Sequence, residues 1–432
     1  MIRAHKRDAF IEFIKSLLLT PFVLNTRPGL VEPGRLTSKE DQPNNTMNRY
    51  LEIFGCIEDL INDHMLHTRN DLPELSRLST LVPNIGAFFT SLPLKATFLA
   101  LEKSHVRSIA GRRLVPPSFN DVRHILNFAQ VNAIANTLKF ITFDGDMTLY
   151  ADGADFAKDS ALVGLILRLL KAGVWVAIVT AAGYPGDADR YEQRLLGLLA
   201  GFKASDLSHD ALSHFYVLGG ECNYLFQYEP AAHRLKYIPE DSYQPEKIRR
   251  WSQATDRINK LLDVAEMDVR HSVSDMNLTD RVSILRKQRA IGVYPKEGFK
   301  LTREQLDEIA LSAQQRIHHH QHSLLRKSQK ESGLLDESSP ALYHPASIEI
   351  PIPFCSFNGG GDVWVDIGNK LIGVLMLQEM FGFSGNQTLH VGDQFSATGN
   401  DIATRRACCT VWITDPNETA QILTELTRLI QQ

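Results

Sequence analysis

The sequence contains few cysteines and no long uncharged apolar run. Cysteine accounts for only 5 of the 432 residues, and no two cysteines form a Cys-x-x-Cys pair. A disulfide framework is therefore not expected, and the thiols are predicted to be reduced. No segment reaches the roughly eighteen uncharged apolar residues that a membrane span requires. These two shortages predict a cytoplasmic protein with no membrane partner.

The sequence also lacks a strong excess of either charge. It has 46 Lys and Arg against 50 Asp and Glu, a formal net charge of -4, and 44% hydrophobic residues. This composition is typical of a globular protein with room for more than one core, and it gives no sign of a nucleic-acid partner. Basic residues precede the first apolar stretch, as in a signal peptide. However, Glu12 and Lys15 interrupt that stretch and no small-residue cleavage site follows.

The pattern of helices and strands divides the chain into four segments. Residues 1–136 predict a helical N-terminal domain with a long Pro- and Gly-containing loop after its first helix. Apolar strands alternate with amphipathic helices in residues 137–201 and again in 354–432, which indicates a parallel sheet covered on both faces. Residues 202–353 differ in pattern and predict an inserted α+β cap. The predicted fold class is α/β: a doubly wound parallel-sheet core with this cap and the helical domain.

Polar residues stand where the predicted core strands end. Asp144 and Asp146 follow the first apolar strand, Thr180 ends the second, and Asp393 ends a late strand. Lys370 opens a helix after a glycine-rich segment. In open parallel sheets, ligands bind beyond the carboxyl ends of the strands. We therefore expect the three carboxylates, the hydroxyl and the ammonium to converge on one crevice.

Such a set of groups suits phosphoryl transfer. Clustered carboxylates repel one another unless a cation lies between them, and hard oxygen ligands select magnesium. Magnesium, a lysine and a hydroxyl together complement the charge on a phosphoryl group. Asp144 is then the candidate nucleophile, forming an aspartyl-phosphate, and Asp146 the candidate acid and base. Because the acid role requires a protonated carboxyl, we expect the pKa of Asp146 to be raised.

Four motifs, in order, resemble those of haloacid-dehalogenase-like phosphatases. The segment DGDMT, which begins at Asp144, matches the DxDxT signature, and Thr180, Lys370 and GDQFSATGND correspond to the second, third and fourth motifs. Five longer segments are more specific: ITFDGDMTLYADG, VTAAGY, GGGDVWVDIGNK and HVGDQF, and PPSFNDVRHILNF in the N-terminal region. In these segments the sequence resembles the IMP-specific 5'-nucleotidase family.

The resemblance implies magnesium-dependent hydrolysis of IMP to inosine and phosphate. It implies that Asp144, Asp393 and the backbone of Asp146 hold Mg²⁺, and that Thr180 and Lys370 bind the phosphate. It implies substrate contacts by a wider set of residues: Asp146, Asp152, Thr180, Asp362, Trp364, Asp366 and Lys370. It also implies a homotetramer with ATP as an effector at the N-terminal domain, where His124 is the candidate effector-binding residue.

Several of these residues also have simpler interpretations. Trp364 fits ordinary core packing as well as it fits stacking on a purine. Lys370, taken alone, fits a surface lysine, and Asp401 fits support of the site better than metal binding. The paired acids do not begin an EF-hand, because Leu149 stands where that loop needs glycine. The run His318–His322 is interpreted as a solvated loop and not as a zinc site.

Two other functions remain compatible with the sequence. A phosphatase of the same mechanism could act on other small phosphomonoesters, such as phosphosugars. Alternatively, the chain could be a nucleotide sensor that kept the fold without catalysis, although the intact acid pair favours activity. The triple glycine 359–361 lacks the following Lys-Ser/Thr of a P-loop, which argues against an NTPase.

Overall fold

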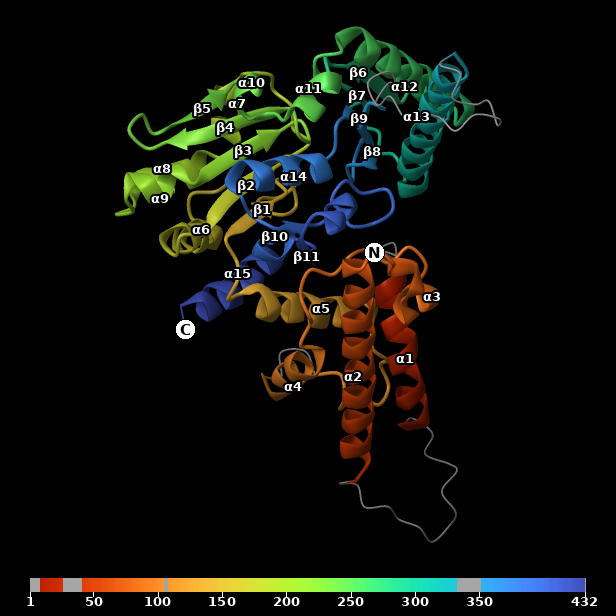
Figure 1. Cartoon of the computed structure of the whole chain (residues 1–432), viewed down its shortest axis with the longest axis vertical. Helices are drawn as coiled ribbons and strands as arrows, with labels where there is room; N and C mark the ends of the chain where they lie inside the picture. Colours follow the sequence, from red (N-terminus) through yellow and green to blue (C-terminus); the bar gives the residue numbers. More distant parts are fainter. Residues whose placement is uncertain (1–7, 26–40, 105–107, 332–350, 432) are drawn as a thin grey trace.

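The computed structural model describes residues 8–25, 41–104, 108–331 and 351–431. Figure 1 shows a helical part at the bottom, a core built on a large sheet, and a smaller sheet with long helices at the upper right. Part of the loop that we expected after the first helix, residues 26–40, lies outside the described residues. Its second part, from Asp41 onward, is helix rather than loop.

The helical N-terminal part contains five α-helices and one short 3-10 helix in its described residues. Their bounds are α1 (Ala9–Asn25), α2 (Asp41–Arg69), η1 (Pro73–Leu75), α3 (Arg77–Leu81), α4 (Leu94–Ser104) and α5 (Phe119–Ile134). Helix α5 begins with a capping box, in which Ser118 and Asp121 each accept a hydrogen bond from the other's backbone N–H. This helix lies between the other N-terminal helices and the core (Figure 1). The predicted helical character of the region is confirmed.

The core is a seven-stranded sheet in the order β11-β10-β1-β2-β3-β4-β5. The strands are β1 (Phe140–Phe143), β2 (Trp175–Val179), β3 (Phe215–Gly219), β4 (Tyr224–Glu229), β5 (Arg234–Ile238), β10 (Thr388–Gly392) and β11 (Cys409–Trp412). The five strands from β11 to β3 are parallel, and β4 and β5 extend the sheet in antiparallel fashion. Continuous apolar strands such as β1 are stable in this position because both faces of the sheet are covered.

The helices that cover the core sheet come from both halves of the sequence. Side chains of α6, α8 and α15 pack with Ile141 and Phe143 of β1 in one hydrophobic cluster. Side chains of α14 pack with Phe140 in a second cluster on the other face. The bounds are α6 (Ala161–Lys171), α7 (Ala188–Arg194), α8 (Leu196–Ala204), α9 (His209–Ser213), α14 (Lys370–Phe381), η2 (Gly385–Gln387), η3 (Ile402–Arg406) and α15 (Pro416–Ile430). The predicted doubly wound α/β core is confirmed.

The cap is a four-stranded antiparallel sheet in the order β6-β7-β9-β8, inserted in the sequence between β5 and α14. Helices α12 and α13 pack on it and on each other. The bounds are α10 (Glu240–Tyr243), α11 (Glu246–Ser252), α12 (Thr255–Asp275), β6 (Val282–Arg286), β7 (Ala290–Pro295), α13 (Arg303–Glu331), β8 (Phe354–Asn358) and β9 (Val363–Ile367).

The predicted boundaries of the cap were wrong at both ends. Strands β3 to β5 were assigned to the cap, but they belong to the core sheet because the fully buried β3 pairs in parallel with β2. Strands β8 and β9 were assigned to the second half of the core, but β9 pairs with β7 in the cap sheet. The change of pattern at residue 202 marks only the last turns of α8.

The histidine-rich segment is also different from the prediction. His318–His322 lies within helix α13 and not in a loop. The helix forms because Ile309, Ala313 and Ile317 recur at helical spacing and are buried in the cap. The imidazole of His318 packs 4.9 Å from the ring of Phe354. Near the fourth motif, the chain forms the short 3-10 helix η3.

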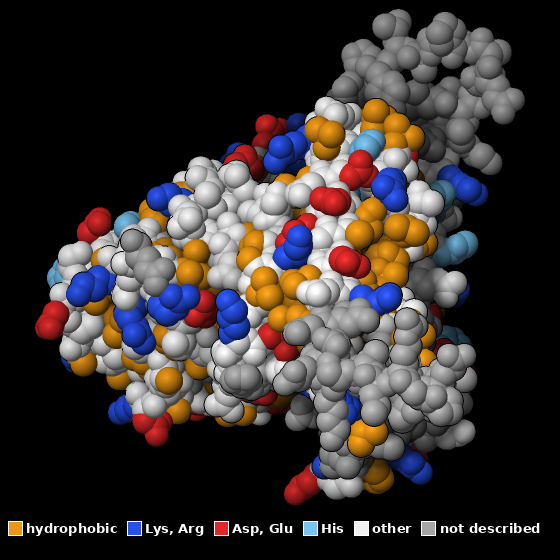
Figure 2. Space-filling model, turned by 90° about the horizontal axis from the view of Figure 1, so that it is seen from below, with side chains coloured by type: hydrophobic (Ala, Val, Ile, Leu, Met, Phe, Trp, Pro, Cys, Tyr) orange, Lys and Arg blue, Asp and Glu red, His pale blue; other side chains and the backbone are white. Residues whose placement is uncertain are grey.

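The surface and the thiols agree with the composition. Among the described residues, no helix is both long and apolar enough to cross a membrane. Figure 2, viewed from below, shows lysine and arginine side chains interspersed with acidic ones, with hydrophobic groups between them.

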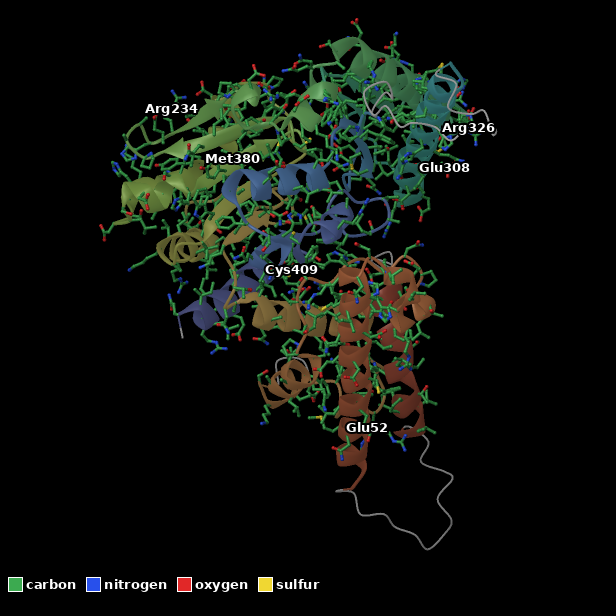
Figure 3. The ribbon with its side chains drawn as sticks, in the orientation of Figure 1. Glu52, Arg234, Glu308, Arg326, Met380 and Cys409 are labelled. Carbon is green, nitrogen blue, oxygen red and sulfur yellow. The ribbon has the colours of Figure 1, made fainter. Side chains whose placement is uncertain are left out.

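The five cysteines are free thiols. Cys409, labelled in Figure 3, is buried in β11 beside the helical part, with its Sγ 3.7 Å from Thr90 Oγ1. The adjacent cysteines 408 and 409 therefore serve as core packing.

The contact between α8 and the loop after the first motif provides a test of the packing. Gly197 lies so close to this loop that a Cβ there would be 2.3 Å from the Phe156 carbonyl oxygen. We expect Gly197→Ala to lower the free energy of unfolding by about 1–3 kcal/mol, since the backbone must shift. Gly164, in the exposed face of α6, has open space around it, and Gly164→Ala should raise stability by about 1 kcal/mol. Urea denaturation measures the free energy of unfolding of both variants. Equal values for the two variants would contradict the close contact between Gly197 and the loop.

Candidate active site

The first motif lies at the carboxyl end of β1. The Asp144 backbone N–H still continues the parallel ladder by donating to Val391 O at 2.9 Å, and the chain then turns sharply. Met147 has a φ of 58°, in the left-handed region. A Cβ at Gly145 would lie 2.5 Å from the Tyr150 hydroxyl oxygen, so a glycine is needed between the two acids. This turn directs Asp144 and Asp146 to the same edge of the sheet.

A buried cluster of charges lies directly behind Asp144. Lys370, the first residue of α14, is fully buried, and its Nζ lies 2.7 Å from an oxygen of Asp144 and 2.7 Å from an oxygen of Asp401. The side chain of Asn369 caps this helix and fixes where it begins. His390 in β10 also contacts Asp401, at 3.0 Å. The lysine is therefore an internal ion-pair partner and not a surface residue.

Burial and pairing act in opposite directions on these charges. Burial raises the pKa of Asp144 well above its usual range, although the neighbouring ammonium of Lys370 opposes the rise. Burial also acts to raise the pKa of Asp401, but Lys370 and His390 outweigh it and hold that pKa well below normal. For Lys370, burial lowers the pKa, but the surrounding carboxylates more than compensate and raise it. The cluster therefore holds an ammonium and an Asp401 carboxylate away from water.

The acids of the first and fourth motifs are close enough to hold a cation. Ligand atoms of Asp144, Asp393 and Asp401 all lie within 4.8 Å of one another. Both oxygens of Asp401 are already engaged, one by Lys370 and His390 and the other by the Gln394 backbone N–H at 2.9 Å. Asp401 is therefore suited to support Lys370. Its neighbours Asp144 and Asp393 are better suited as ligands of a hard cation such as magnesium.

Asp146 lies farther out and has a different environment. One of its oxygens is 3.3 Å from Nη2 of Arg194 in α7 and accepts a hydrogen bond from Gly153 N at 3.2 Å. Burial raises the pKa of Asp146, and the Arg194 guanidinium partly offsets this. The expectation of a raised pKa is confirmed, with burial as its main cause. A carboxyl group of this kind can hold a proton and release it.

A cavity of about 650 Å³ joins these groups to the cap. It lies between the carboxyl edge of the core sheet and the cap strands. Its lining includes eight of the predicted site residues: Asp144, Asp146, Asp152, Thr180, Asp362, Trp364, Asp366 and Asp393. Lys370 is buried behind Asp144. The predicted convergence on one crevice is confirmed for Asp144, Asp146, Thr180 and Asp393, whereas Lys370 does not line the cavity.

Trp364 is partly exposed in this cavity and is not a core residue. Its indole N–H donates to Asp362 Oδ2 at 2.8 Å, which fixes the orientation of the ring. Nζ of Lys287 lies 4.4 Å from the ring centroid. Asp366 beside it is buried, and its pKa is raised well above normal by burial, with the nearby Glu221 adding to the rise. This end of the cavity offers a flat aromatic surface among polar groups.

The sequence did not reveal several residues of the site. The cavity is also lined by four cations: Arg190, Arg194, Lys287 and Arg289. They come from α7 and from the β6–β7 turn, which contain none of the four motifs that identified the other site residues. His390 had a weak signal, as a polar residue within an apolar strand, and it is fully buried behind Asp401.

His124, the expected effector-binding residue, lies away from this cavity in α5. It is buried, and its Nδ1 is 3.2 Å from a carboxylate oxygen of Glu418 in α15. The ring also meets Phe128 edge-on, with centroids 5.7 Å apart. Because the ring is buried, an effector could bind this imidazole only after a rearrangement that exposed it.

Comparison with known proteins now identifies the family. A family model described as IMP-specific 5'-nucleotidase matches residues 1–423. This chain belongs to the IMP-specific 5'-nucleotidase family. A relative from Yarrowia lipolytica named IMP-specific 5'-nucleotidase 1 is 42% identical over 437 residues, which cover 100% of this chain and 96% of the relative. One of the same name from Emericella nidulans is 42% identical, with 98% of this chain and 96% of the relative covered.

Solved structures of the family share the fold. The IMP-bound, N-terminally truncated IMP-nucleotidase of Plasmodium falciparum is 31% identical, with a TM-score of 0.78 over 98% of this chain and 96% of that one. An ATP-bound structure of the same P. falciparum enzyme is also 31% identical, with a TM-score of 0.72 over 98% of this chain and 85% of that one. The haloacid-dehalogenase-like fold predicted from the motifs is thereby confirmed.

The buried lysine of this family member gives a test of the site's electrostatics. Lys370→Met leaves two buried carboxylates without their ammonium, so we expect the free energy of unfolding to fall by about 3–5 kcal/mol at pH 7. Lys236→Met removes an exposed pair with Glu229 and should cost at most about 1 kcal/mol. Urea denaturation with a metal chelator present measures both variants.

The pH dependence of the same variant has a defined sign. Lys370 lowers the pKa of both Asp144 and Asp401, so its removal should raise the folded-state pKa values of these two carboxyl groups relative to the unsubstituted chain. The folded variant then binds more protons than the folded unsubstituted chain, so its relative stability increases as the pH falls. The deficit of Lys370→Met relative to the unsubstituted chain should therefore shrink between pH 7 and pH 5. A deficit that grows over this range would contradict the assignment.

Proposed function

We propose that this chain is a magnesium-dependent nucleotidase that hydrolyses IMP to inosine and phosphate. The observation that carries the proposal is that Asp144 and Asp146 line the same cavity, with Lys370 paired to Asp144 from behind. Membership of the family supports the substrate, because the relatives are named for IMP and the P. falciparum structure has IMP bound.

In the proposed mechanism, Asp144 is the nucleophile. Its carboxylate attacks phosphorus, and an aspartyl-phosphate forms as the bond to the 5'-oxygen of inosine breaks. Asp146 donates its proton to that leaving oxygen. It then takes a proton from water as the water attacks the phosphorus, which releases phosphate and restores the Asp144 carboxylate. Burial favours the protonated form of both acids, and a nearby cation opposes it in each case, Lys370 for Asp144 and Arg194 for Asp146. The magnesium ion proposed below would add a second cation beside Asp144 and favour its carboxylate form.

The remaining core residues would bind the phosphate and the metal ion. Thr180 lines the cavity and can donate its hydroxyl to a phosphate oxygen, and Lys370 offsets negative charge at Asp144. Magnesium would be held by Asp144, Asp393 and the backbone of Asp146. When bound, it supplies positive charge that offsets the charge of the phosphoryl oxygens. The donor set fits this ion because it consists of oxygen atoms only.

The cap side of the cavity would bind the nucleoside. The partly exposed ring of Trp364 provides a surface on which a purine can stack. The carboxyl groups of Asp362 and Asp366 in the cap, and of Asp152 in the core loop after β1, can accept hydrogen bonds from ribose hydroxyls or from a base N–H. We further propose ATP as an effector and a homotetrameric assembly. The ATP-bound structure of the P. falciparum relative supports the effector. Equilibrium binding of ATP and the solution mass test these two points.

Phosphate release from a panel of monoesters tests the function. We expect IMP to be hydrolysed faster than AMP, GMP or sugar phosphates, and Asp144→Asn to reduce turnover of IMP by several orders of magnitude while the protein stays folded. Asp210→Asn, on the exposed helix α9, is the matched control and should leave turnover unchanged. Equal rates on all substrates would indicate a general phosphatase. No release by the unsubstituted chain with magnesium would indicate a sensor.

The pH profile tests the role of Asp146. Because Arg194 lowers the pKa of this acid, Arg194→Met should raise that pKa further. The protonated form then persists to higher pH, so the alkaline limb of the kcat profile should move upward. Arg250→Met, which removes an exposed pair with Glu246 in the cap, should leave the limb in place. If the alkaline limb of the kcat profile stays fixed or moves to lower pH in Arg194→Met, Asp146 is not the general acid.

A further inference from the structure

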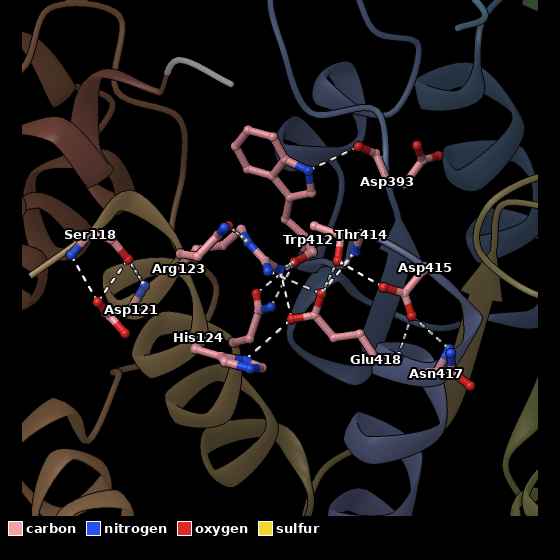
Figure 4. A network of polar contacts seen from close by, with 12 residues as sticks. Ser118, Asp121, Arg123, His124, Asp393, Trp412, Thr414, Asp415, Asn417 and Glu418 are labelled. Carbon is pink, nitrogen blue, oxygen red and sulfur yellow. Dashed lines mark hydrogen bonds and ion pairs between the residues drawn. The ribbon is translucent and has the colours of Figure 1, made fainter. Parts of the chain in front are cut away.

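The backbone of the metal-site residue Asp393 is held by a tryptophan. The indole N–H of Trp412 donates to the Asp393 carbonyl oxygen at 2.9 Å, and Figure 4 shows this contact reaching from β11 to the end of β10. In the parallel ladder, Trp412 lies opposite Gly392, the residue just before Asp393. The hydrogen bond therefore fixes the chain at the point where it leaves β10 and presents the carboxylate.

Trp412 is in turn held by the N-terminal helical part. Strand β11 is the edge of the sheet, so its outer N–H and C=O groups have no neighbouring strand. Asn127 of α5 replaces that strand, since its amide donates to Trp412 O at 2.7 Å and its oxygen accepts from Trp412 N at 3.1 Å. Arg123 of α5 also donates to Trp412 O. The indole is buried against Phe119 and Phe395, with centroids 5.4 and 6.0 Å away.

A second carboxylate locks α5 to the core beside this contact. Glu418, in the first turn of α15, lies 2.9 Å from a guanidinium nitrogen of Arg123 and 3.2 Å from Nδ1 of His124. The same carboxylate accepts hydrogen bonds from the backbone N–H and the hydroxyl of Thr414, at 2.9 and 2.8 Å. These groups are drawn together in Figure 4. The network ties α5, the end of β11 and α15 into one unit.

We infer that Trp412 is a positioning residue for the metal-binding carboxylate, and that α5 of the N-terminal part sets its position. Helix α5 holds the backbone of Trp412, the indole holds the backbone of Asp393, and Asp393 faces Asp144. The inference rests on the proposed function, in which Asp144 and Asp393 bind magnesium. Residues that orient metal ligands typically contribute 10–100-fold to metal affinity.

A purely structural role for Trp412 makes a different prediction. If the ring only filled space between Phe119 and Phe395, an aromatic replacement would alter stability without altering metal binding. Positioning through the N–H instead predicts weaker magnesium binding in a chain that remains folded. It also predicts that excess magnesium restores turnover, because the lost contact acts on the metal ligand and not on the nucleophile.

The test measures magnesium affinity of the full chain by calorimetry in the Trp412→Phe variant, which keeps a buried ring but removes the N–H. We expect binding about 10–100-fold weaker than in the unsubstituted chain. We also expect a matching shift in the magnesium dependence of IMP hydrolysis and a kcat that recovers at saturating magnesium. Trp175→Phe, in β2 at the opposite end of the strands from the site, is the matched control and should bind magnesium normally.

A second variant covers the case in which Trp412→Phe does not fold. Asn127→Ala removes both side-chain contacts to the Trp412 backbone and leaves the indole in place, so magnesium affinity should fall severalfold. Unchanged magnesium affinity in a folded Trp412→Phe, or in Asn127→Ala if the first variant is unfolded, overturns the inference. An unsubstituted chain that binds no magnesium overturns both this inference and the proposed function. A third outcome separates the two proposals. If the unsubstituted chain binds magnesium, the substitutions weaken that binding as expected, and IMP is nevertheless not hydrolysed, the positioning role is supported and only the nucleotidase function is overturned.

Discussion

The ion pair network around Lys370 is the constraint on which the rest of the site depends. An ammonium that is fully removed from water is stable only when carboxylates and further hydrogen bonds surround it. Asp144 comes from the end of β1, Asp401 from the loop after β10, and Lys370 from the start of α14. Removing one of these charges leaves its partners buried without compensation, which lowers the stability of the fold. Segments distant in the sequence must therefore meet at this point before the core is complete.

The position of the cap follows from the same lysine. Strand β9 ends at Ile367, and Gly368, with a φ of 92°, turns the chain into the helix that begins with Lys370. A Cβ at Gly368 would lie 2.3 Å from the Cys222 sulfur, so the chain passes very close to the core there. The cap residues Asp362 and Trp364 thus stand on a strand whose end is fixed by the buried ion pairs. The cap wall of the cavity and the buried Lys370 are therefore joined by a short, constrained segment.

The sequence predicted those features that depend on a local pattern of residues. It did not predict those that depend on which strands, distant in the sequence, pair with one another. The ends of β1, β2 and β10 could be located because parallel strands buried on both faces are continuous apolar runs, and Asp144, Thr180 and Asp393 follow them directly. The cap boundary could not be located, because an apolar strand such as β3 has the same sequence pattern whether it belongs to the core sheet or to the cap sheet. The cations Arg194 and Lys287 carry no motif, and only the folded chain brings them to the cavity.

The N-terminal part is a structural component of the core sheet and not an appendage. Strand β11 lies at the edge of the sheet, and α5 covers it with side chains that bond to its backbone. Without that cover, the outer groups of Trp412 would face water and the edge would be open to other partners. The neighbouring strand β10 carries both His390, which contacts Asp401, and the chain leading into Asp393. The edge that α5 protects is thus one strand away from the buried charges. The helical part and the chain that leads into Asp393 are therefore stabilised by the same contacts.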